Sequence, residues 1–139
     1  MANTLTTQII ADGPRNAVVQ IEGNQNTSDL AYVAVINPAS GFVGMDNTGT
    51  VLPADFRIMR LQYSVEDGFT VDVWWDAATP VLLTSLNGRG EIKWDRFGGM
   101  VNYSGAGRTG KIALSTQGWT ASATLSFTLV FEMIKQGTL

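Results

Sequence analysis

The chain has 139 residues and a net charge of −3 at pH 7, with 45% hydrophobic and 15% charged residues, which fits one folded domain and argues against disorder. Because it contains neither Cys nor His, the sequence excludes thiol nucleophiles, disulfides, imidazole bases and most zinc ligand sets. The negative charge opposes nucleic-acid binding, for which a basic patch supplies the affinity.

The N-terminal residues 1–11 are polar and have strand character. They lack the basic opening and the apolar run of a signal peptide, and no apolar stretch of the chain is long enough to span a bilayer. We therefore expect a protein that is made in the cytoplasm, is not secreted and does not enter a membrane. Because a polar strand at a chain end is free to pair with a neighbouring molecule, residues 1–11 are a candidate assembly arm.

The first core strand is predicted where Ala17, Val19 and Ile21 alternate with polar residues. Residues 30–36 are apolar on both faces, which is typical of a central strand or of a strand at an interface. A single helical turn fits residues 52–56. Long polar loops, the natural places for assembly contacts, are predicted at residues 39–49 and 97–110.

Two alternating segments, residues 59–65 and 69–75, flank the turn-forming sequence Glu66-Asp67-Gly68, and this arrangement predicts a hairpin. Residues 80–86 are again apolar on both faces, and shorter strands are predicted at residues 92–94 and 111–116.

The longest alternation covers residues 123–133, where every second residue is apolar, as expected of a strand with one buried face. Glycine, proline and asparagine clusters separate the predicted strands at spacings that suit an all-β fold. We predict a single-domain antiparallel β-sandwich of jelly-roll type over residues 1–139.

Residues 105–112 match the glycine and lysine spacing of a phosphate-binding loop. Such a loop needs a Ser or Thr after the lysine and a helix behind it, but Ile112 follows Lys111 and a strand is predicted next. We therefore interpret this segment as a loop between strands and expect no nucleotide cofactor. For the chain as a whole we also expect no metal site and no catalytic residue.

Trp74 is predicted on the polar face of its strand between Asp72 and Asp76, whereas Trp75 points the other way and belongs to the core. An exposed Trp between acids is typical of a subunit contact or of a platform for a sugar ring. Arg outnumbers Lys, and Arg is favoured at protein interfaces. The candidate interface residues are Trp74, Asp72, Asp76, Arg89, Arg96, Phe97 and Arg108.

Several segments resemble small virion structural proteins of tailed bacteriophages. The segments that carry this resemblance are residues 3–7, 9–19, 88–90, 96–99, 105–110 and 127–136. The resemblance implies a head decoration (cement) protein, a β-sandwich that forms homotrimers on the capsid surface and clamps neighbouring major capsid subunits. Residues 39–52 match nothing in that family, and we expect partner specificity to differ there.

Three alternatives remain open from the sequence. The chain could be a carbohydrate-binding surface module that uses Trp74 or Trp119 as a platform, or a structural protein of the tail or connector. An acid-only hydrolase would need two carboxyl groups whose pKa values are pushed apart in a cleft, and we consider it the weakest of the three.

Overall fold

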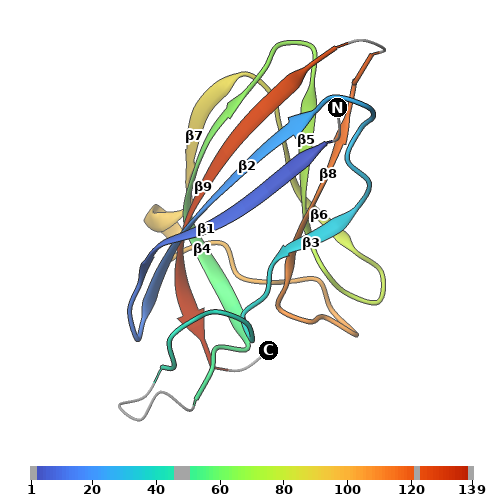
Figure 1. Ribbon diagram of the computed structural model, residues 1–139. Coiled ribbons are helices and arrows are strands. Elements are labelled where there is room, and N and C mark those ends of the chain that lie inside the picture. The colour runs from blue at the N-terminus through green and yellow to red at the C-terminus, as the bar shows by residue number, and fades with distance from the viewer. Residues whose placement is uncertain (1–2, 46–50, 121–122, 138–139) are drawn as a thin grey trace.

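The computed structural model describes residues 3–45, 51–120 and 123–137, and these form two antiparallel β-sheets (Figure 1). The elements in chain order are β1 (Thr4–Asp12), β2 (Asn16–Gln25), β3 (Val33–Ile36), β4 (Asp55–Val65), β5 (Thr70–Trp75), β6 (Val81–Leu86), β7 (Arg89–Lys93), the 3-10 turn η1 (Asp95–Phe97), β8 (Ile112–Gln117) and β9 (Leu125–Gln136).

One sheet has the order β1-β2-β9-β4-β7 and the other the order β3-β8-β5-β6, and every pairing is antiparallel. The predicted all-β class and the sandwich architecture are confirmed. The jelly-roll connectivity stays a prediction.

The core lies between the two sheets, because each strand turns its apolar alternate residues inward. The alternation predicted at residues 123–133 is confirmed in β9, where Phe127, Leu129 and Phe131 are buried. Trp75 of β5 is fully buried in the same core, as the sequence predicts. The predicted strand over residues 17–21 is confirmed as part of β2, and the two shorter predictions correspond to β7 and β8.

The predicted hairpin of residues 59–65 and 69–75 is wrong. β4 pairs with β7 and β9, whereas β5 pairs with β6 and β8 in the other sheet. The turn at residues 66–68 therefore carries the chain from one sheet to the other. An alternating pattern specifies which face of a strand is buried, but not which strand lies beside it, so both arrangements satisfied the sequence.

Residues 30–36 and 80–86 do not form central strands, because β3 and β6 are the two edges of the four-stranded sheet. Their apolar residues remain partly accessible, and Leu82 keeps 43% of its surface exposed. The interface alternative for these strands stays a prediction. The helical turn predicted at residues 52–56 is also wrong: β4 begins at Asp55, which pairs with Gln136 of β9, and extended pairing excludes a helical turn there.

Residues 39–45 and 98–110 form loops, as predicted, whereas Phe97 of the second predicted loop is the last residue of η1. Residues 46–49 of the first predicted loop lie outside the described residues. Residues 4–11 of the candidate arm pair with β2 as part of β1, and residues 1–2 are not described. The role of this segment in assembly stays a prediction. Within the described ranges, no helix has the length and apolar character needed to cross a membrane.

Candidate functional site

Asp72 and Trp74 both lie on the outer face of the four-stranded sheet, two residues apart on β5. Residues directly opposite each other in an antiparallel pair lie on the same face of the sheet. Asp72 is opposite Ser115 of β8 and Ser85 of β6, and Trp74 is opposite Ala113 and Leu82 on the same strands. The prediction that Asp72 and Trp74 share the outer face of one strand is confirmed.

Asp72 is buried under its own hydrogen-bond donors. The Ser85 hydroxyl donates to its Oδ1 at 2.6 Å, and the Gln117 side-chain amide donates to its Oδ2 at 2.9 Å. A carboxylate removed from water in this way is stabilised by hydrogen bonds within the chain rather than by solvent.

Trp74 is held in one orientation by two neighbours. Its indole Nε1 donates to the Ser115 hydroxyl at 2.8 Å. The Tyr32 ring meets the indole edge-on, with 6.1 Å between ring centroids and an angle of 71° between the ring planes. This edge-to-face geometry is a preferred one for an aromatic pair, so Tyr32 and Trp74 support each other's orientation.

Asp76 lies beside the aromatic pair and accepts two side-chain hydrogen bonds. The Tyr32 hydroxyl donates to its Oδ1 at 2.5 Å, and the Thr109 hydroxyl donates to its Oδ2 at 2.7 Å. The bond from Tyr32 is the main reason that the pKa of Asp76 lies below its usual value. Burial, together with the bond to this carboxylate and its charge, raises the pKa of Tyr32.

We call Tyr32, Asp72, Trp74, Asp76 and Leu82 the Trp74 face. All four carboxylate oxygens of its two acids accept a hydrogen bond from the chain, and its indole N–H donates one. What the Trp74 face presents to a partner is therefore a fixed aromatic and aliphatic surface whose polar groups are already paired.

The other predicted interface residues lie elsewhere. Arg96 and Phe97 are exposed in η1, where Phe97 keeps 77% of its surface accessible. In Figure 1, η1 lies at the left edge of the molecule and the four-stranded sheet at the right. η1 therefore lies away from the four-stranded sheet that carries the Trp74 face.

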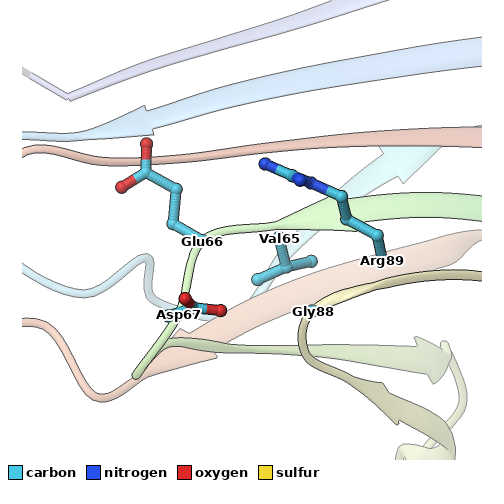
Figure 2. A pocket seen from close by; sticks show the side chains of 5 residues that line it. All are labelled: Val65, Glu66, Asp67, Gly88 and Arg89. Atoms are coloured by element: carbon cyan, nitrogen blue, oxygen red, sulfur yellow. The ribbon is translucent and has the colours of Figure 1, made fainter.

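Arg89 lines an open polar hollow of about 570 Å³ between two turns, with Val65, Glu66, Asp67 and Gly88 (Figure 2). The side chains of Glu66 and Arg89 point to the same side of this hollow. Glu66 also accepts a hydrogen bond from the Ser126 hydroxyl at 3.2 Å. Glu66, Asp67 and Arg89 are all exposed, so the charges of this hollow face water.

Arg108 belongs to the same loop as Thr109 but lines a separate cavity of about 110 Å³ together with Asp55 and Asn102. Burial raises the pKa of Asp55, partly offset by hydrogen bonds from the Phe56 N–H and Asn102 and by the charge of Arg108. The structure thus unites Asp72, Trp74 and Asp76, and leaves Arg89, Arg96 with Phe97, and Arg108 in three other places.

Sequence reasoning did not identify the partners that complete the Trp74 face. These partners are Tyr32, Thr109, Leu82, Ser85, Ser115 and Gln117. The indole N–H of Trp119, the other predicted platform, is already used within the chain: it donates to the carbonyl oxygens of Gln25, at the end of β2, and of Ala123, both at 3.1 Å.

Residues 105–110 form a loop and β8 follows, so no helix stands behind the phosphate-loop spacing, as the sequence predicts. In the part of the chain that the structure describes, acidic residues do not gather in threes as a metal-ligand set. No protein-family model matches the chain, and no curated protein matches it.

Proposed function

We propose that this protein is a non-enzymatic structural protein of a bacteriophage virion, which binds the outside of the capsid and stabilises it by clamping neighbouring major capsid subunits. The observation that carries the protein-contact part of the proposal is the Trp74 face, where an aromatic pair lies among carboxylates whose oxygens all accept hydrogen bonds within the chain.

Covering this face with another protein costs little electrostatically. A free carboxylate loses its hydration when a partner buries it, and this penalty often cancels the gain from contact. Asp72 and Asp76 already have donors that stay in place after burial. The apolar surface of Tyr32, Trp74 and Leu82 then contributes to binding, as aromatic residues do at interface centres.

The capsid as partner is supported by the resemblance of six segments to phage virion proteins, not by the geometry. A shell benefits from such a protein because symmetry repeats one modest contact over the whole surface. The partners on this proposal are the major capsid protein and other copies of the chain, as a homotrimer. A tail or connector structural protein remains the alternative placement.

A carbohydrate-binding module is the second candidate, because Tyr32 and Trp74 form an aromatic pair beside Asp76 on an open sheet face. Sugar recognition combines ring stacking with hydrogen bonds to hydroxyl groups. The indole N–H and all four carboxylate oxygens are already engaged within the chain. This favours contact with a protein surface over a glycan.

The first experiment is the copy number of this protein in purified particles, measured by quantitative mass spectrometry against the major capsid protein. We expect a ratio near one to one. A ratio of a few per cent would move the protein to the tail or to a vertex, and its absence from particles would overturn the proposal.

The second experiment compares Trp74→Ala with the control Gln62→Ala, which alters an exposed residue of β4 in the other sheet. We expect Trp74→Ala to weaken capsid binding at least tenfold while Gln62→Ala leaves it unchanged, since truncation of a central interface aromatic typically costs about 2 kcal/mol or more. Glycan binding that is lost in Trp74→Ala, with capsid binding intact, would favour the carbohydrate module instead.

A further inference from the structure

β1 is the longest open edge of the sandwich. The outermost strands of the two sheets are β1, β7, β3 and β6. β1 has nine residues, whereas β3 has four, β7 has five and β6 has six. An edge strand presents a row of backbone N–H and C=O groups that are free to pair with another strand.

Before the bulge between Ile9 and Ala11, β1 also lacks the features that normally prevent such pairing. Charged residues, proline and short length are the usual protections of an edge strand. β7 carries Arg89, Glu91 and Lys93, and Pro80 directly precedes β6. From Thr4 to Ala11, β1 has no charged residue and no proline, and Ile9 and Ile10 keep 37% and 51% of their surface exposed.

We propose that β1 of one copy pairs with β1 of a second copy in antiparallel orientation, joining two five-stranded sheets across a two-fold axis. This inference goes beyond the proposed function, since it names a contact between copies that is separate from capsid binding. A second copy is the partner because the segment is complementary to itself: every residue from Thr4 to Ala11 is neutral, so no pairing of identical segments opposes like charges.

The faces of the strand restrict the register. Leu5, Thr7 and Ile9 lie on the core side of the sheet, since they pair with Gly23, Ile21 and Val19 of β2. A two-fold axis perpendicular to the sheet keeps the two core sides together only if core-side residues oppose core-side residues. An axis centred on any residue satisfies this condition; centring it on Thr7, the middle of the segment before the bulge, places Leu5 opposite Ile9 and Thr6 opposite Gln8.

β1 is anchored at its N-terminal end, and a bulge marks where its regular pairing stops. The Asn3 side chain accepts hydrogen bonds from the N–H groups of Asn26 at 2.7 Å and Thr27 at 2.9 Å. A bulge between Ile9 and Ala11 interrupts the regular register and limits the pairing to residues before it. The strand therefore needs no folding step on association, which distinguishes this contact from an exchanged arm. Two-fold pairing joins two copies only, so a trimer would need a second, different contact.

The test uses paired charge variants of the purified full chain, with mass measured by native mass spectrometry and sedimentation. Thr6 and Gln8 are exposed, lie on the outer face and oppose each other across the proposed axis. Thr6→Lys/Gln8→Lys should lose the dimer, because each copy then opposes Lys to Lys. The variant Thr6→Glu/Gln8→Glu should lose it for the same reason. Mixing the two variants should restore a dimer that contains one copy of each.

The control is Ser64→Lys, an exposed position on β4, which lies between β9 and β7 and away from the β1 edge, and this variant should keep the dimer. The register is checked by single cysteine variants, since the chain has no native Cys. After oxidation, Thr7→Cys should form more disulfide-linked dimer than Thr6→Cys or Gln8→Cys, because only residue 7 opposes its own counterpart.

A wild-type chain that remains monomeric at all concentrations, or a mixture that fails to restore the dimer, would overturn this inference. Equal disulfide yields at the three positions would overturn the register. None of these outcomes depends on particles, so the failure of the capsid proposal remains distinguishable. If the protein forms this dimer but is absent from virions, the contact between copies is supported and the proposed function is overturned.

Discussion

Lys135 and Asp12 form an ion pair that joins the C-terminal strand β9 to the turn between β1 and β2, and the Lys135 side chain is completely buried. The ammonium group also donates to the carbonyl oxygens of Gly13 at 2.6 Å and Val43 at 2.7 Å. The second carboxylate oxygen of Asp12 accepts from the Val43 N–H at 2.7 Å. One buried charge thus holds three separate segments of the chain together.

We predict that Asp12→Ala lowers the free energy of unfolding by about 3–5 kcal/mol, because it leaves the buried Lys135 ammonium without its counter-charge. Replacing both partners, as Asp12→Leu/Lys135→Met, should recover most of the loss, since no uncompensated charge remains. Urea denaturation of the three proteins measures this. A double variant no more stable than Asp12→Ala would show that the ion pair is not the reason for the loss.

Removal of residues 1–11 should weaken assembly more than it weakens the fold. Most side chains of β1 are exposed, so their removal takes little apolar area from the core, and Asp12 is retained. We expect a cooperative thermal transition in the shortened chain and a loss of association in sedimentation. The matched chain without residues 1–12 also loses Asp12 and should be several kcal/mol less stable. Loss of cooperative melting in the first truncation would contradict this prediction.

The hydrogen bond from Tyr32 to Asp76 should make part of the stability depend on pH. The pKa of Asp76 is lower in the folded protein, so its contribution is present above the ordinary Asp value of about 4 and is lost as the pH falls through the folded-state pKa. Tyr32→Phe should cost about 1 kcal/mol at pH 7, since the bond is partly exposed. Urea denaturation from pH 7 down to pH 2 should show this difference shrinking. A constant difference would assign the effect to packing.

The charge of Asp55 should change the stability with pH in the opposite direction to that of Asp76. Because burial raises its pKa in the folded protein, its charged form is unfavourable at pH 7, and stability is regained as the pH falls through the folded-state pKa. Asp55→Asn keeps an oxygen for the Phe56 N–H and should raise the free energy of unfolding at pH 7 by up to about 1 kcal/mol. A clear loss of stability would mean that the charge of Arg108 outweighs the cost of burial.

The sequence was sufficient to predict the sandwich and the faces of its strands, because burial of alternate residues is a local property. β9 and the opposite orientations of Trp74 and Trp75 follow from it directly. The completion of the Trp74 face depends on strand order, which no local pattern encodes. Tyr32 reaches Asp76 across 44 residues, and Gln117 reaches Asp72 across 45, only because β8 lies between β3 and β5.

The wrong hairpin prediction has the same cause: strands that are neighbours in the sequence need not be neighbours in the sheet. Residues 66–68 have the composition of a tight turn, and their local conformation does reverse the chain. Whether the strands on either side then pair is decided by competition with β9 and β8, which are far away in the sequence.

The central position of β9 determines when the molecule can fold during its synthesis. β9 is the last strand in the chain, yet it lies between β2 and β4 in the five-stranded sheet. While its residues are still inside the ribosome, β2 and β4 have no shared neighbour, and their apolar faces are exposed to other nascent chains and to chaperones. The five-stranded sheet can therefore be completed only after β9 has emerged, long after β2 and β4 have been made.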